Sequence, residues 1–216
     1  YSVFFEIFFK SIKKYKSKKP IILIGSKKLI SQQIKKFKFN LKINLIDQNK
    51  INFNKINNKR INVINVDLPL NYRFFKISKS SKNYITKCFN ISLTLLKTKK
   101  FSGLINGPVS KKHFLQNKFL GITEYLAKKT KIISDFAMLI YEKNLSVCPI
   151  TTHLPLKAVS KNLSKKKIIS KAELIKNFFI KNFKKNPRIA ITGLNPHCES
   201  FERNSEEKKF IIPAIK

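Results

Sequence analysis

Two histidines of this sequence directly follow apolar runs. His153 comes after the run Leu145–Thr151, in the segment Thr-Thr-His-Leu-Pro-Leu, and His197 comes after the run Arg188–Leu194, in the segment Asn-Pro-His. Ligands of parallel α/β folds collect where strands end, and an imidazole placed there can bind a metal ion or transfer a proton. The two histidines lie far apart in the sequence. The residues alone therefore leave open whether they share one metal ion or are two separate structural histidines.

The segment Asn106–Lys112 also follows an apolar run, and its pair Gly107-Pro108 favours a sharp turn. Ser110 stands where it could cap a following helix. The free N–H groups of a helix start, together with the charge of Lys111, suit a phosphate or a carboxylate. The spacing alone favours an ordinary strand-to-helix turn over an anion-binding site. Lys111 is therefore a tentative candidate for a substrate contact.

Other reactive residue types are better explained as structural. His113 lies in a lysine-rich helix start and is expected at the surface, and Cys198 is expected to be packed. The three cysteines are widely spaced and form no Cys-x-x-Cys pair, which fits a reduced cytoplasm. The sequence contains no Gly-x-Gly-x-x-Gly, no Walker P-loop and no Gly-x-Ser-x-Gly. A nucleotide cofactor would therefore have to bind in another way.

These candidates need elements that position them, and the first half of the chain alternates strand and helix patterns. Apolar runs bounded by turn residues predict strands, and apolar residues at helical spacing predict helices. The expected strands are Pro20–Gly25, Leu41–Ile46, Ile61–Val66 and Ser102–Asn106. The expected helices are 29–37, which Ser26 can cap, and Tyr84–Leu96.

The second half continues the alternation. We expect a helix at Thr123–Lys129, hairpin strands at Phe136–Tyr141 and Leu145–Thr151, a helix from the cap Ser164 to about Asn182, a strand at Arg188–Leu194 and a helix from about Ser205. Ile168 and Phe178 are among the residues expected to face inward on the long helix. This order predicts an α/β protein with a mostly parallel sheet and flanking helices, without a reliable internal domain boundary.

The charge is large, but we interpret it as a bias of composition. The chain has 216 residues, 46 of them Lys or Arg, and a formal net charge of +35. Only four of these basic residues are arginine, the residue on which nucleic-acid surfaces rely for bidentate and stacking contacts. A nucleic-acid-binding surface is therefore the less favoured alternative to lysines spread over solvated faces. No uncharged apolar stretch reaches the about 18 residues of a membrane-spanning helix, and Val3–Phe9 lacks the features of a signal peptide.

Four motifs occur in one order and together resemble a known family. They are Asn-Gly-Pro-Val-Ser-Lys at Asn106–Lys111, Gly-Ile-Thr-Glu-Tyr-Leu-Ala at Gly121–Ala127, Thr-Thr-His-Leu-Pro-Leu at Thr151–Leu156 and Gly-Leu-Asn-Pro-His at Gly193–His197. In this combination the sequence resembles the 4-hydroxythreonine-4-phosphate dehydrogenases of pyridoxal phosphate (vitamin B6) biosynthesis. The resemblance extends from about Gly103 to Lys216, with the metal-site and substrate-site motifs in 103–200.

The resemblance implies an α/β fold like that of isocitrate and isopropylmalate dehydrogenases, and a cytoplasmic homodimer with active sites at the subunit interface. It implies NAD-dependent oxidation of 4-phosphooxy-L-threonine, followed by loss of CO₂ to give 3-amino-2-oxopropyl phosphate. It also implies a divalent metal ion, Zn²⁺, Mg²⁺ or Co²⁺, held by His153 and His197, and a substrate contact from Thr123. It assigns neither a catalytic residue nor the residues that contact NAD.

The sequence departs from the family pattern in three places. Ile122 stands where the family often has a second substrate-contacting histidine, and isoleucine cannot form that hydrogen bond. Ser2–Phe5 replaces a Gly-Pro-rich turn. The family's third metal histidine and further substrate contacts are expected beyond Lys216. We therefore expect residues 1–216 to be a partial dehydrogenase, truncated at both ends and with an incomplete C-terminal part, that lacks activity by itself. A truncated, inactive relative is the alternative.

Overall fold

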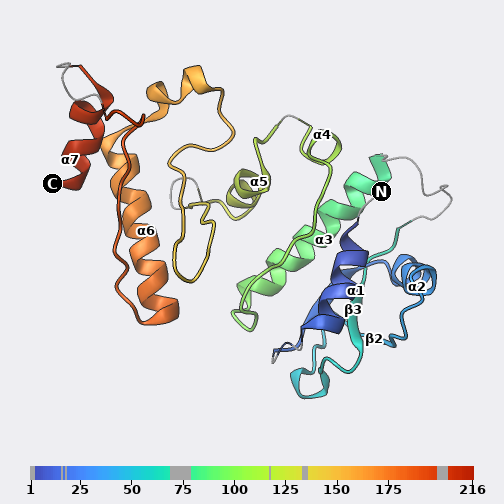
Figure 1. The fold of residues 1–216 in the computed structure, drawn as a ribbon. Helices are drawn as coiled ribbons and strands as arrows, with labels where there is room; N and C mark the ends of the chain where they lie inside the picture. Colours follow the sequence, from blue (N-terminus) through green and yellow to red (C-terminus); the bar gives the residue numbers. More distant parts are fainter. Residues whose placement is uncertain are drawn as a thin grey trace. The chain divides into compact units, whose positions relative to one another are not determined.

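The structure of the chain is a computed structural model that describes residues 3–15, 17, 19–68, 79–116, 118–132, 136–198 and 204–216. The chain divides into two compact units, Tyr1–Gln116 (unit 1) and Asn117–Lys216 (unit 2). Figure 1 shows the helices and strands of each unit. This division rests on contacts within the chain and does not test where the dehydrogenase region begins and ends. The expected extent of that region, residues 1–216, stays a prediction. No helix of the described residues is long and apolar enough to span a membrane.

Unit 1 is built on a three-stranded parallel sheet. Its strands are β1 (Ile22–Gly25), β2 (Ile43–Leu45) and β3 (Ile61–Asn65), with β3 between the other two. These positions confirm three of the expected strands. Residues Ile61 to Ile64 of β3 are all buried, which is typical of a strand covered on both faces. Asn62 is the polar member of this run, and its amide donates to the carbonyls of Ile21 and Asn57 at 3.1 and 2.8 Å.

Helices cover this sheet and complete the core of unit 1. They are α1 (Phe4–Lys14), α2 (Lys27–Lys36), α3 (Lys79–Lys97) and α4 (Lys111–Phe114), with a 3-10 turn η1 (Phe53–Lys55) in the long connection before β3. The cap of α2 is confirmed, because the hydroxyl of Ser26 accepts from the N–H of Leu29 at 3.4 Å. Phe9 of α1 and Ile30 of α2 are fully buried in a cluster with residues of β1 and β3.

The strand expected at Ser102–Asn106 is wrong. Within the described residues, this segment pairs with none of the three strands of unit 1 and forms irregular chain between α3 and α4. Ile105, in the middle of the apolar run, is 83% exposed. An apolar run becomes a strand only where a neighbouring backbone can pair with it, and a sequence pattern does not supply that neighbour.

Unit 2 consists of helices and long connections. They are α5 (Ile122–Lys129), the 3-10 turns η2 (Leu156–Ala158) and η3 (Ser160–Asn162), α6 (Lys165–Phe183), the π-helical turn η4 (Glu207–Ile211) and α7 (Ile212–Ile215). The predicted helices at α5, α6 and the C-terminal segment are confirmed. Ser164 caps α6, because its hydroxyl accepts from the N–H of Lys167 at 3.2 Å. Ile168 of α6 is buried, and α6 packs against η4 and α7.

The hairpin expected in unit 2 is present as a turn with one bridge. Ile140 and Val147 exchange backbone hydrogen bonds of 2.8 and 2.9 Å in antiparallel orientation. The carboxylate of Glu142 accepts from the N–H groups of Asn144 and Leu145 at 2.7 and 3.2 Å, and these bonds lower the pKa of Glu142. The full strands expected on either side of this turn are wrong, because pairing stops after the single bridge among the described residues.

One predicted strand and one predicted buried residue of unit 2 are wrong for the same reason. Arg188–Leu194 forms no strand in the described part of the chain, and Ile189 and Leu194 are 41% and 37% exposed. Phe178, expected to face inward on α6, is 41% exposed. Both expectations rest on apolar patterns. Such a pattern indicates which face of an element is suited to burial, but it does not indicate whether another part of the fold covers that face.

Candidate functional site

The first turn of α5 holds two of the residues singled out by the sequence. Ile122 and Thr123 open this helix, and both are half-buried. Gly121 precedes them at the N-cap position, and its carbonyl accepts from the N–H of Tyr125 at 3.2 Å. Glu124 lies in the same turn, where a negative charge interacts favourably with the helix dipole. A hydroxyl and a carboxylate are thus adjacent in this turn.

Glu124 connects α5 to the segment that carries His153. Its Oε1 atom accepts from the hydroxyl of Thr152, the residue before His153, at 2.9 Å. Its Oε2 atom is buried from solvent and has no hydrogen-bond partner among the residues that the structure describes. A buried acceptor without a partner costs about 1–3 kcal/mol, and more when it is charged. Sequence analysis missed Glu124, although its place after Thr123 in a functional motif was a usable signal.

Gly121 brings the carboxylate and the imidazole to one place. A Cβ atom on Gly121 would lie 2.9 Å from Oε2 of Glu124 and 3.2 Å from Nε2 of His153. Both side-chain atoms therefore border the space that the missing side chain leaves open. A side chain at position 121 would have to displace these two side-chain ends, so glycine keeps the space between them open.

The backbone of His153 adopts an uncommon conformation. Its φ angle is 57°, in the left-handed region, which is sparsely populated for residues other than glycine although histidine is enriched there. The side chain of His153 is exposed, and Pro155 and η2 follow it. An exposed imidazole beside a buried carboxylate oxygen fits a ligand to a divalent cation, because metal-binding histidines usually have a carboxylate or carbonyl neighbour.

His197 lies in a tight loop of unit 2. Its N–H donates to Oδ1 of Asn195 at 2.9 Å, and its side chain is exposed. Sγ of Cys198 lies where a Cβ atom on Gly193 would be, so a side chain at this position would have to displace the thiol. Cys198 is exposed, which corrects the expectation that it is packed. The loop thus holds His197 at the surface of the unit, where a ligand can reach it.

The metal site predicted to be shared by His153 and His197 stays a prediction. Among the residues that the structure describes, no three His, Cys, Asp or Glu side chains gather closely enough to hold a metal ion. Two histidines supply two ligands, whereas catalytic zinc sites use three protein ligands and a water or substrate atom. An ion held by these two histidines would therefore take its other ligands from water, substrate or further protein groups.

Lys111 lies in unit 1, as the exposed first residue of α4. Ser110 occupies the N-cap position of this helix, but its hydroxyl lies 2.9 Å from Nδ1 of His113 and makes no capping hydrogen bond. The expected side-chain cap is therefore wrong, because the imidazole engages the hydroxyl. His113 is exposed, as expected. With only four residues in α4, an anion contact here would depend on the charge of Lys111 itself.

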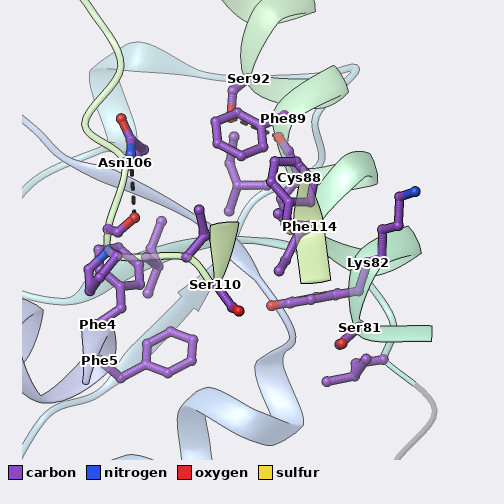
Figure 2. Close-up of a pocket in the computed structure, with 18 of the residues that line it drawn as sticks. Phe4, Phe5, Ser81, Lys82, Cys88, Phe89, Ser92, Asn106, Ser110 and Phe114 are labelled. Atoms are coloured by element: carbon purple, nitrogen blue, oxygen red, sulfur yellow. Dashed lines mark hydrogen bonds between the residues drawn. The ribbon is translucent and has the colours of Figure 1, made fainter. Parts of the chain in front are cut away.

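Unit 1 also contains a pocket of about 320 Å³ that sequence analysis missed. Figure 2 shows Phe4 and Phe5 on one side of it and Phe89 and Phe114 on another, with Ser110 between them. Most of the lining is apolar, so the pocket suits an aromatic ring or another small apolar group. The usable signal was the four-residue spacing of three lining residues that share one face of α3: Tyr84, Cys88 and Ser92.

Burial raises the pKa values of two side chains that line this pocket. The hydroxyl of Tyr84 accepts from the N–H of Ser26 at 2.8 Å, and burial raises the pKa of Tyr84. Burial also raises the pKa of the Cys88 thiol to about 11. Cys88 is therefore protonated at neutral pH, which makes it a poor nucleophile. The pocket can hold apolar groups, but these two side chains do not equip it for covalent chemistry.

Comparisons with known proteins point to one family. The family model described as pyridoxal phosphate biosynthetic protein PdxA matches residues 16–216. A 4-hydroxythreonine-4-phosphate dehydrogenase of Sulfurihydrogenibium is 36% identical over 160 residues, which are 72% of this chain and 48% of the relative. That of Aquifex aeolicus is 40% identical over 118 residues, which are 52% of this chain and 36% of the relative. The chain thus spans about half or less of the length of these curated relatives.

Solved structures agree with the fold. A 4-hydroxythreonine-4-phosphate dehydrogenase from Burkholderia phymatum superposes with a TM-score of 0.80 at 23% identity, covering 99% of this chain and 66% of that one. A putative one from Salmonella typhimurium gives 0.81 at 24% identity, covering 99% and 67%. This likeness confirms the expected α/β fold of the isocitrate dehydrogenase type. Since the family model covers nearly the whole sequence, the chain belongs to the PdxA family of pyridoxal phosphate biosynthetic proteins.

Proposed function

We propose that this chain is part of a NAD-dependent dehydrogenase of pyridoxal phosphate biosynthesis. The enzyme oxidises 4-phosphooxy-L-threonine and releases CO₂ to give 3-amino-2-oxopropyl phosphate. Membership of the PdxA family supports this activity, since curated relatives carry the name 4-hydroxythreonine-4-phosphate dehydrogenase. The observation that carries the proposal is the group around Gly121, where a buried carboxylate oxygen and an exposed imidazole border one space. A cytoplasmic homodimer with active sites at its interface belongs to the same proposal.

The named residues have distinct roles in this proposal. His153 and His197 hold a divalent cation, Zn²⁺, Mg²⁺ or Co²⁺, which when bound supplies Lewis-acid polarisation of the substrate hydroxyl. Thr123 hydrogen-bonds to the substrate from the first turn of α5, while Ile122 beside it offers an apolar contact only. Lys111 attracts the phosphate or carboxylate of the substrate by its positive charge.

The test is an activity assay on the protein expressed from its complete gene. NADH formation from 4-phosphooxy-L-threonine is measured with added Zn²⁺, Mg²⁺ or Co²⁺. We expect turnover that His153→Ala and His197→Ala each reduce by more than about 100-fold, because removing a metal ligand weakens and distorts the site. Lys111→Ala should raise KM, while Lys176→Ala, at an exposed lysine of α6, should change nothing. A metal-independent activity, or none at all, would contradict the proposal.

The alternatives predict other outcomes. An inactive relative would show no turnover at any metal concentration, although it would retain the fold. A nucleic-acid-binding protein would bind duplex DNA tightly near physiological salt, whereas lysines that are dispersed over the surface bind weakly and release DNA steeply as salt rises. Fluorescence anisotropy with labelled DNA at several salt concentrations distinguishes these cases.

A further inference from the structure

One carboxylate oxygen of Glu124 accepts a hydrogen bond and the other accepts none from the described residues. The inference drawn from this difference rests on the proposed metal-binding role of His153. We propose that Glu124 is a positioning residue for His153. In this arrangement Nε2–H of the ring donates a hydrogen bond to Oε2 of Glu124, and the proton stays on Nε2. The other ring nitrogen, Nδ1, is then the atom that binds the metal ion.

The geometry supplies the first part of the argument. The hydroxyl of Thr152 holds Oε1 of Glu124 at 2.9 Å, which ties the carboxylate to the backbone segment that carries His153. The free Oε2 atom is buried and lies on the same small space as Nε2 of His153. Gly121 has no side chain to fill this space, so the ring can approach the carboxylate without a steric obstacle.

The chemistry of the two groups supplies the second part. An ionised carboxylate only accepts hydrogen bonds, whereas a neutral imidazole has one N–H and one lone pair. In the proposed contact, the carboxylate oxygen therefore favours the tautomer with its proton on Nε2 and leaves the lone pair on Nδ1. The same contact gives the buried Oε2 atom the partner that it otherwise lacks, and so removes an unfavourable contribution to folding. In most metal-binding histidines, the ring nitrogen that does not bind the metal likewise donates its N–H to a carboxylate, a carbonyl or a water molecule.

The direct test is the tautomer of His153 in the metal-free 216-residue chain. Long-range ¹H–¹⁵N correlation spectra at a pH of about 8, where histidine is neutral, distinguish the two tautomers. We expect the Nε2–H tautomer to predominate in the wild type. Glu124→Gln should shift the population toward Nδ1–H, because the amide can accept from Thr152 while its NH₂ group donates to Nε2. Glu124→Ala should give a mixture without either preference.

Three controls separate positioning from a general loss of structure. His113, whose Nδ1 atom contacts Ser110 in the other unit, should keep its tautomer in every variant. Glu173→Gln, at an exposed carboxylate of α6, should leave the His153 spectrum unchanged. Gly121→Ala should mimic Glu124→Ala, because its methyl group separates the two partners. Gly103→Ala should not, because no atom of the described residues lies within 4 Å of its Cβ position.

Metal affinity provides a second readout. Zn²⁺ binding, measured by competition with a chromophoric chelator, should weaken by about 10–100-fold in Glu124→Gln, the usual effect of removing such a carboxylate. Wild-type spectra with Nδ1–H predominating, or Glu124 variants with unchanged tautomer, would overturn the inference. Neither measurement requires substrate or turnover. A failed activity assay would therefore count against the proposed function alone, and an unchanged tautomer would count against the role of Glu124 even in an active enzyme.

Discussion

The two units of the chain cover their apolar residues differently. In unit 1, β3 has a parallel neighbour on each side, and Phe9, Ile30 and Val63 are fully buried. In unit 2, the described residues form no ladder longer than one bridge, and Phe178 and Phe183 of α6 are 41% and 39% exposed. The sequence patterns of the two units are equally apolar. The difference shows that burial depends on the neighbours that the fold supplies. The candidate residues around Gly121 and His197 belong to the less covered unit.

The largest expected effect contrasts the two cores directly. Ile30→Ala removes a fully buried side chain between α2 and the sheet and should lower the free energy of unfolding by about 2–5 kcal/mol. Phe178→Ala removes a partly exposed ring that contacts Phe179 and Phe183 and should cost about 1 kcal/mol. Urea denaturation of each variant measures both values. Equal losses would break the contrast between the units.

Gly107 tests how tightly unit 1 is packed beside its pocket. A Cβ atom on Gly107 would collide with the ring of Phe4, so Gly107→Ala should destabilise the chain by about 1–3 kcal/mol. The matched control is Gly103→Ala in the same segment, where no atom in the described part of the chain lies within 4 Å of the new Cβ. That change should leave stability the same or raise it slightly, because it restricts the unfolded chain. Thermal unfolding that separates the two variants would sharpen the comparison, and identical midpoints would contradict the packing of Phe4.

Helix caps offer a smaller test of the same comparison. Ser26 and Ser164 both cap helices, but Ser26 is buried in unit 1 and Ser164 is half-buried in unit 2. Replacing either by Ala should cost about 1 kcal/mol, with the larger loss at Ser26, where the orphaned N–H is shielded from water. Chemical denaturation of the two single variants provides the measurement. A larger loss at Ser164 would show that burial is not what distinguishes the units.

The smallest expected effect is a dependence on alkaline pH in unit 1. Burial raises the pKa of Cys88 from 9.0 to about 11, so the folded state keeps a proton that the unfolded state releases. Stability should therefore be full below pH 9.0 and fall as the pH rises toward 11. Cys88→Ser should reduce this fall, with the remainder due to Tyr84, whose pKa burial also raises; denaturation midpoints across the pH series measure both profiles. A wild type and variant with parallel profiles would show that the thiol does not contribute.

Local patterns predicted those elements that their own residues determine. The apolar run Ile61–Val66 forms the central strand β3, and α6 begins directly after Ser164, which caps this helix. The segments 102–106 and 188–194 have similar patterns but no pairing partner in the described chain. A strand requires a second backbone, which a single run of residues cannot specify.

The candidate site follows the same rule. The family motifs identified Thr123, His153 and His197, because their residue types and order are visible in the sequence. The place of Glu124 after Thr123 in a motif was visible too, but its bond to the hydroxyl of Thr152 and its position at the space beside Gly121 exist only after folding. The pocket of unit 1 was missed for the same reason, because its walls come from segments that are distant in the sequence.

The packing of Phe4 against Gly107 also limits the chemical lifetime of the chain. A side chain on Gly107 would collide with the ring of Phe4, and the residue before Gly107 is the exposed Asn106. In an Asn-Gly pair no side chain shields the following backbone nitrogen, which attacks the asparagine amide carbon and expels ammonia to form a cyclic imide. Water then opens this imide at either of its two carbonyls. Ageing would therefore convert Asn106 into aspartate or isoaspartate, placing a new negative charge on a residue that lines the pocket. The contact that stabilises this turn thus also makes it the place where stored protein should deamidate first.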